Sequence, residues 1–128
     1  MSKRVVRTEA APAPFQGAPY NQGIAANGFV FVAGQLGLDP ATGQIVEGGI
    51  TAQTERVFAN LRAVLEAAGA SLDSIVKTTV FLSNLDDFAA MNDVYARHIG
   101  DQPPARSTVE VGRLPSGALV EIEAIAVA

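Results

Sequence analysis

The chain has no cysteine and no tryptophan among its 128 residues, and its only histidine is His98. The missing thiols exclude a disulfide framework, a thiolate metal site and a cysteine nucleophile, and they suit a reducing compartment. One histidine argues against a site with several histidine ligands. We therefore expect no metal site. Any chemistry must come from arginine, carboxylate, hydroxyl and backbone groups.

Long apolar runs and positive charge are also scarce. No window of about 18 residues is apolar and free of charge, so the sequence predicts no membrane-spanning helix. The first residues carry charges without an apolar core, unlike a secretion signal, and we expect a cytoplasmic protein. The chain has 9 Lys and Arg against 13 Asp and Glu, a net charge of -4. This balance speaks against nucleic acid as a partner.

Two segments of the chain have helical patterns. Residues 51–69 repeat apolar side chains at the spacing of one helix face, with Thr51 as the expected N-cap and Gly69 just past the end. Residues 84–100 have Asn84 as a cap, acidic residues in the first turn and basic residues in the last turn, which suits the helix dipole. The apolar face of this second helix is expected to consist of Phe88, Met91 and Tyr95.

The remaining apolar runs have the character of strands. They are residues 4–8, 28–35, 75–82 and a pair within 103–125. The run at 28–35 is apolar at both alternating sets of positions, which predicts a strand buried on both sides. The expected order β-β-α-β-α-β-β indicates a single α+β domain over residues 1–128, with a mixed, mostly antiparallel sheet and two helices packed on one face.

The last pair of strands carries a prediction about register. Two alternating runs flank a turn rich in Gly, Pro and Ser, which predicts an antiparallel hairpin. Burial of apolar surface, at roughly 25 cal/mol per Å², favours the register that places Val109 and Val111 beside Val120 and Ile122. A slip by one residue would turn each side chain to the other face.

This register would bring the charged side chains of the hairpin together. Arg106 and Thr108 would share a face with Glu121, which predicts a small polar site for a carboxylated ligand. A structural ion pair between Arg106 and Glu121 is the alternative. Apolar side chains also lie on this face, so we expect a homo-oligomer with the site near a subunit boundary. In a monomer, the long Glu and Arg stems would cover those positions instead.

Several short motifs agree with one family in order and spacing. They are Pro104-Ala105-Arg106-Ser107-Thr108-Val109-Glu110-Val111, Leu114-Pro115, Val120-Glu121-Ile122-Glu123-Ala124-Ile125-Ala126, Pro19-Tyr20-x-Gln22, Ala33-Gly34-Gln35, Leu65-Glu66-Ala67-Ala68-Gly69, Val76-Lys77-Thr78-Thr79-Val80-Phe81 and Met91-Asn92-x-x-Tyr95. Together they resemble the signature of the Rid family, the YjgF-type reactive intermediate deaminases. The resemblance covers nearly the whole chain.

The resemblance implies a chorismate-mutase-like fold, a homotrimer with clefts between subunits, and a role in metabolite damage control. It implies cofactor-independent hydrolysis of 2-enamine and 2-imine acids, such as 2-aminoacrylate, 2-iminopropanoate and 2-iminobutanoate, to 2-keto acids and ammonia. Arg106 would hold the substrate carboxylate, Glu121 would bind the water, and Thr108 stands where many members carry Cys. Tyr20, Gly34 and Asn92 would complete the substrate-binding set.

Elementary chemistry agrees with these implied roles. The planar fork of arginine pairs with a carboxylate through two hydrogen bonds, and an imine is already electrophilic. Two departures from the family pattern concern substrate range: Ala33 stands where Ser is common, and Gly17-Ala18-Pro19 replaces the usual Gly-Pro. The alternatives are a non-catalytic trimer that binds small carboxylates, a regulatory interaction protein, or a protein that acts on RNA.

Overall fold

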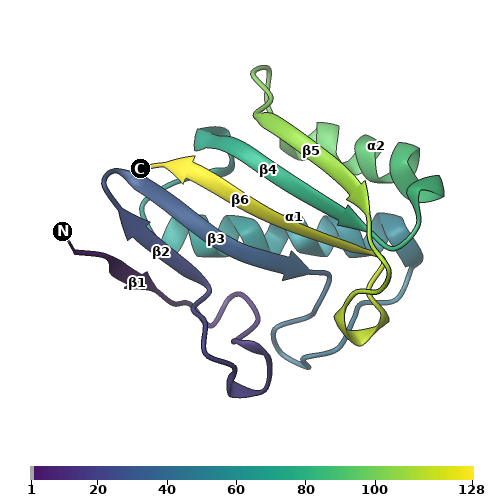
Figure 1. Cartoon of the computed structure of the whole chain (residues 1–128), viewed down its shortest axis with the longest axis horizontal. Coiled ribbons are helices and arrows are strands. Elements are labelled where there is room, and N and C mark those ends of the chain that lie inside the picture. Colours follow the sequence, from purple (N-terminus) through teal and green to yellow (C-terminus); the bar gives the residue numbers. More distant parts are fainter. Residues whose placement is uncertain (1) are drawn as a thin grey trace.

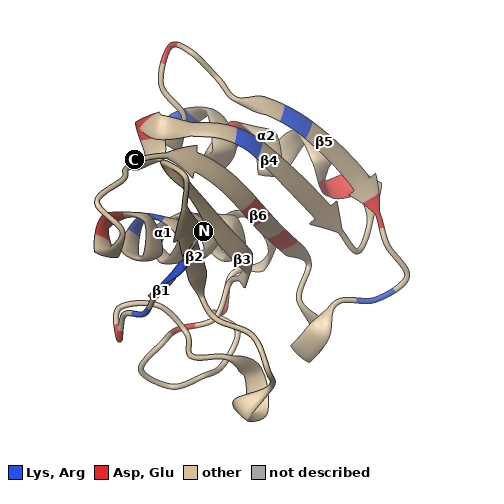
Figure 2. Cartoon of the chain, turned by 60° about the vertical axis from the view of Figure 1, so that its left-hand side comes forward, with Lys and Arg blue, Asp and Glu red and all other residues tan. Residues whose placement is uncertain are grey.

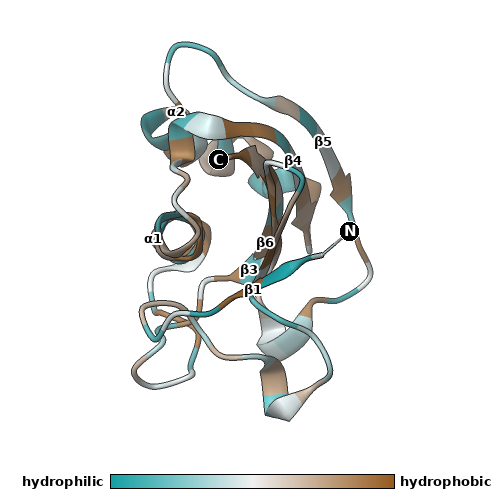
Figure 3. Ribbon diagram, turned by 90° about the vertical axis from the view of Figure 1, so that its left-hand side faces the viewer, coloured by the Kyte–Doolittle hydropathy of each residue, from teal (hydrophilic) through white to brown (hydrophobic). Residues whose placement is uncertain are grey.

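Residues 2–128, which the computed structural model describes, form one six-stranded sheet and two α-helices (Figure 1). The elements are β1 (Arg4–Val6), β2 (Gly23–Ala26), β3 (Phe29–Leu36), α1 (Gly49–Ala67), β4 (Ile75–Leu82), α2 (Phe88–His98), β5 (Ala105–Glu110) and β6 (Val120–Val127). The strand order is β1-β2-β3-β6-β4-β5, and β4 and β5 form the parallel pair in an otherwise antiparallel sheet. Both helices lie on the same side of the sheet (Figure 3), which confirms the predicted α+β class.

Strand β2 is absent from the sequence-based prediction. It has only four residues, three of them Gly or Ala, so it lacks the alternation that marks a strand. It pairs antiparallel with both β1 and β3. The signal that would have found it is the turn at Asn27 and Gly28, where φ is 53° and 78°. An Asn-Gly pair with positive φ at both residues is the preferred two-residue turn of a β-hairpin.

Strand β3 is buried on one face only, and the prediction of burial on both faces was wrong. Val30 and Val32 are buried, whereas Phe29 and Phe31 on the other face are 41% and 44% exposed. The two helices cover only one side of the sheet, so the apolar character of the second face is not satisfied inside one chain. We call this second side the open face of the sheet.

The predicted hairpin between β5 and β6 was also wrong. Strand β4 lies between them and pairs parallel with β5 and antiparallel with β6. Val80 of β4 therefore takes the place beside Ile122 that Val109 or Val111 was expected to occupy. The physical reason is α2, because two parallel strands need a long crossover connection and the helix between β4 and β5 supplies it.

Helix α1 has the predicted apolar face but begins earlier than expected. The predicted stripe is buried, and it consists of Val57, Leu61, Val64, Leu65 and Ala68. Gly48, with φ of 115°, is the N-cap instead of Thr51. Gly69, with φ of 81°, follows the C-cap as predicted. Neither helix within residues 2–128 combines the length and the apolar character needed to cross a membrane.

Helix α2 is fixed at both ends. Asn84 Oδ1 accepts a hydrogen bond of 2.8 Å from the Asp86 N–H and caps the short 3₁₀ turn that leads into the helix. At the other end, the His98 ring stacks on Phe58 of α1 with centroids 4.8 Å apart. His98 Nε2 also lies 2.5 Å from Glu55 Oε1. These contacts give His98 a structural role between the two helices.

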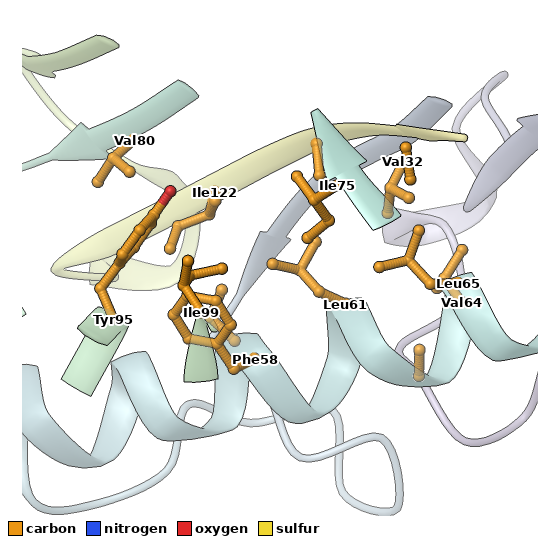
Figure 4. Packing of buried hydrophobic residues seen from close by; sticks show 14 of the residues in the cluster. Val32, Phe58, Leu61, Val64, Leu65, Ile75, Val80, Tyr95, Ile99 and Ile122 are labelled. Atoms are coloured by element: carbon orange, nitrogen blue, oxygen red, sulfur yellow. The ribbon is translucent and has the colours of Figure 1, made fainter. Parts of the chain in front are cut away.

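Phe58 is the side chain on which the two helices meet. It is fully buried, and its ring contacts Tyr95 edge-on at 5.4 Å as well as His98. Figure 4 shows it between α1 and the buried side chains that descend from the sheet. We expect Phe58→Ala to lower the free energy of unfolding by about 3–5 kcal/mol, because it leaves a large cavity. Urea denaturation at a fixed protein concentration measures this loss, and a loss under about 1 kcal/mol would contradict the packing.

Candidate active site

Arg106 lies on β5, directly across the ladder from Thr78 of β4, and points toward α2. Its guanidinium carbon is 4.7 Å from the ring centroid of Tyr95 and 5.5 Å from that of Phe88, and both rings belong to α2. These distances are within the range of cation–π attraction. Within residues 2–128, no carboxylate lies within ion-pair distance of Arg106. Its donors therefore remain available for a ligand.

Asn92 lies beside Arg106 in the same cavity. Its Oδ1 is buried and has no hydrogen-bond partner within the described part of the chain. A buried acceptor without a partner is costly, so a donor from a ligand would stabilise it. The cavity has a volume of about 340 Å³ and is lined by Asn92, Tyr95, Ala96, Ile99, Gly100, Pro103 and Arg106. We call it the Arg106 pocket.

Glu121 lies in the middle of β6, paired with Leu36 of β3 on one side and with Phe81 of β4 on the other. Its side chain is on the open face and is half-buried. Burial raises the pKa of the Glu121 carboxyl above its ordinary value, and the nearby charge of Glu123 raises this pKa further. A glutamate with a raised pKa on a partly covered surface is a candidate for proton transfer. Figure 2 shows the acidic positions of β6 on strands that otherwise carry few charges.

Gly34 makes room for the Glu121 side chain. The pairing of β3 with β6 shifts between Val32 and Gln35, and Gly34 lies in this irregular stretch. A Cβ at position 34 would lie 2.8 Å from Cδ of Glu121, closer than real side chains pack. Any other residue here would therefore push the Glu121 side chain away from β3. The irregular pairing and the glycine together place a carboxylate against the backbone of β3.

Tyr20 is held beside Gly34 by an ordered loop. The side chain of Gln22 is buried and forms four hydrogen bonds to backbone atoms: one from the Thr8 N–H and three to the carbonyl oxygens of Thr8, Ala11 and Pro12. The Tyr20 hydroxyl accepts a hydrogen bond of 2.8 Å from the Phe15 N–H, which leaves its own proton free to donate.

Tyr20 and Gly34 share the lining of one small cavity. The side chain of Glu121 lies against Gly34. We call these three residues the Glu121 half-site.

The structure separates the predicted cluster of Arg106, Thr108 and Glu121. Across the ladders, Thr108 pairs with Val80 and shares the helix-covered face with Arg106, whereas Glu121 is on the open face. The prediction that these three share one face of one chain was therefore wrong, because β4 was not expected between β5 and β6. The pairings of β5 and of β6 with β4 determine which of their side chains share a face, and these pairings differ from a direct pairing of β5 with β6. Arg106 and Asn92 come together, Tyr20, Gly34 and Glu121 come together, and Thr108 lines neither cavity.

Two residues beside Arg106 were not predicted as part of a site. Phe88 and Tyr95 were assigned to the apolar face of the second helix, and Tyr95 is indeed buried. Phe88, however, is 40% exposed. The available signal was their spacing of seven residues, which places both on one side of a helix two turns apart. Their contact with Arg106 depends on the tertiary packing of α2 against β5.

The fold, the Arg106 pocket and the Glu121 half-site define a small α+β protein whose unpaired arginine suits an anionic ligand. Comparison with known proteins makes the class specific. The family model described as endoribonuclease L-PSP matches residues 8–128. The chain belongs to this family, the YjgF/Rid family, as its motifs indicated.

Relatives align with nearly the whole chain. A RutC family protein of Pyrococcus abyssi is 54% identical over 98% of this chain and 98% of its own length. A 2-iminobutanoate/2-iminopropanoate deaminase of Capra hircus is 42% identical over 98% of this chain and 90% of its own length. Among solved structures, a Rid family protein of unknown function from Yersinia pestis superposes with a TM-score of 0.94 at 47% identity, covering 99% of this chain and all of that one.

Proposed function

We propose that this protein hydrolyses 2-imine and 2-enamine acids, such as 2-iminopropanoate and 2-iminobutanoate, to 2-keto acids and ammonia. The observation that carries the proposal is the Arg106 pocket. It is lined by an arginine without a carboxylate partner and by Asn92, whose Oδ1 has no hydrogen-bond partner within residues 2–128. A 2-imino acid has a carboxylate next to a nitrogen that carries hydrogen. Such a ligand would supply an anion for Arg106 and a donor for Asn92 at once.

The reaction needs little beyond orientation and a proton acceptor. Arg106 binds the carboxylate through two hydrogen bonds, and Asn92 Oδ1 accepts the N–H of the substrate. Water adds to the electrophilic carbon and gives a carbinolamine, whose nitrogen takes up a proton and leaves as ammonia with formation of the C=O bond. Glu121 accepts the proton of the attacking water and returns it to the nitrogen. One water is consumed for each keto acid and ammonia.

We further propose that a second copy of the chain completes the site. In one chain, Arg106 and Glu121 lie on opposite faces of the sheet. The open face also exposes large apolar side chains, with Phe31, Val109 and Val127 each 42–44% exposed. Burial of this face in a homotrimer would remove that surface from water and bring the Glu121 half-site of one copy to the Arg106 pocket of the next.

The relatives support this reaction class. The Capra hircus protein is named for the deamination of 2-iminobutanoate and 2-iminopropanoate. A relative from Arabidopsis thaliana, 47% identical over 98% of this chain, is named a reactive intermediate deaminase. The presence of Arg106 in a pocket without a competing carboxylate is consistent with the same chemistry here.

An assay on short-lived substrates tests the proposal. A pyridoxal-phosphate-dependent dehydratase would generate 2-aminoacrylate and 2-aminocrotonate in the cuvette, with and without the protein. We expect the keto acid to form faster than by free hydrolysis, since the site orients both the imine and the water. Unchanged rates of keto-acid formation would contradict the proposed enzymatic activity. Unchanged rates together with calorimetric binding of 2-oxobutanoate would instead support the non-catalytic binder of small carboxylates.

A further inference from the structure

Arg106 has a long flexible side chain on an edge strand, yet two ring contacts define its place. Its guanidinium carbon lies over the rings of Tyr95 and Phe88. An arginine side chain loses roughly 2 kcal/mol of rotamer entropy when it is fixed. A ligand that met a mobile arginine would bear this cost on binding, whereas a side chain already held by the fold does not impose it.

Tyr95 is the more firmly held of the two rings. Its hydroxyl lies 2.6 Å from Oγ1 of Thr78, and both residues are buried. Phe58 contacts the ring edge-on from the core side, with an interplanar angle of 82°. Figure 4 shows Tyr95 rising from α2 with its hydroxyl directed toward the strands.

Thr78 is also the ladder partner of Arg106. Thr78, which anchors the Tyr95 ring, and Arg106, which lies over that ring, are therefore neighbours on β4 and β5. Any tilt of α2 that moved Tyr95 would break the hydrogen bond to Thr78.

Phe88 is the second ring beside the arginine. It is the first residue of α2, its ring is 40% exposed, and its centroid lies 5.5 Å from the guanidinium carbon. Aromatic faces attract a cation but accept no strong hydrogen bond, so the N–H donors of Arg106 are held without being consumed. A carboxylate in place of either ring would have paired with Arg106 and blocked a ligand.

We propose that Tyr95, anchored by Thr78 and assisted by Phe88, is a positioning residue that fixes the Arg106 guanidinium before the ligand arrives. The inference rests on the proposed function for the identity of the ligand, a small carboxylate. The two rings restrict the Arg106 side chain before any ligand binds, so this part of the inference can be tested without a ligand.

The first test observes Arg106 directly. In protein labelled with ¹⁵N-arginine, the Arg106 Nε–H resonance, assigned by its loss in Arg106→Lys, is expected to be shifted upfield by the ring currents and to show restricted motion. Tyr95→Leu should return it toward the position of a free arginine, whereas Tyr95→Phe, which keeps the ring, should retain most of the shift. A free-arginine resonance in the unsubstituted protein would overturn the inference, and this holds whether or not Tyr95→Leu folds.

The second test measures calorimetric binding of 2-oxobutanoate. Tyr95→Leu should weaken binding by roughly 3- to 30-fold, the range of one or two cation–π contacts. It should have no further effect in the Arg106→Ala background, because the two residues act through the same contact. Phe88→Leu should weaken binding less. Leu61→Ala serves as the control, because it damages the buried core away from Arg106 and should leave binding unchanged.

The two tests separate the possible failures. Binding that depends on Arg106 but is unaffected by Tyr95→Leu would overturn the positioning role and leave the proposed function intact. A ring-shifted and restricted Arg106 in a protein that does not speed keto-acid release in the coupled assay would support the positioning of Arg106 and contradict the proposed function.

Discussion

Arg106→Ala is expected to lower kcat/KM for imine hydrolysis by about 10²- to 10⁴-fold, the loss that corresponds to two charge-assisted hydrogen bonds. The side chain lies in the Arg106 pocket without a carboxylate partner, so little of the fold depends on it. Arg106→Lys should recover only part of the rate, because an ammonium group is a point charge and cannot form the planar paired contact. The measurement is keto-acid release in the coupled assay.

A matched control uses an arginine outside both pockets. Arg113 lies exposed in the segment between β5 and β6 and lines neither of them. Arg113→Ala changes the net charge by the same amount and should leave kcat/KM within about twofold. Equal losses in both variants would show that overall charge, not the pocket, is responsible. Unchanged hydrolysis in Arg106→Ala would overturn the proposed function.

The same variant can test the composite site. Copies carrying Arg106→Ala and copies carrying Glu121→Gln should each be inactive alone. If every site takes Arg106 from one copy and Glu121 from its neighbour, random mixing of equal amounts restores both groups to about a quarter of the sites. No recovery after co-expression and co-purification would contradict the composite site.

Glu121→Gln is the second substitution with a large expected effect. As the proton acceptor, Glu121 must be ionised, so activity should fall as the pH drops through its pKa. Burial and the charge of Glu123 raise this pKa, which places the acidic limb of the pH–rate profile above the range of an ordinary glutamate. Glutamine should remove the limb and lower kcat by about 10²- to 10⁴-fold.

Glu123→Gln is the control for the electrostatic part of this argument. It removes the neighbouring charge that raises the pKa of Glu121. The acidic limb should therefore move to lower pH while most of the rate is retained. A limb that stays in place in Glu121→Gln would show that another group controls the pH dependence.

Stability should respond to Glu121→Gln in the opposite direction from activity. A carboxyl whose pKa is raised by folding binds its proton more tightly in the folded state than in the unfolded state. Its ionisation therefore reduces stability as the pH rises from the unfolded pKa through the folded one. Glutamine does not ionise, so Glu121→Gln should not lose this stability. Urea denaturation of the variant at neutral pH measures the difference. Lower activity with equal or greater stability would separate a catalytic role from simple unfolding.

The sequence by itself determined the α+β class, the two helices and the family. Periodic apolar positions such as Val57, Leu61 and Val64 fix the buried face of α1, because a helix repeats every 3.6 residues whatever it packs against. The motifs around Tyr20, Asn92, Arg106 and Glu121 identified the family, because this identification needs only the order and spacing of residues along the chain.

Only the tertiary structure decided which of those residues meet. Local alternation along β5 and β6 was compatible with a hairpin, and nothing within those two strands reveals that β4 inserts between them. Strand order depends on the long-range crossover through α2, and each inserted strand resets which side chains share a face. For this reason Arg106 packs against the aromatic rings of α2, and Glu121 packs against Gly34 on the open face.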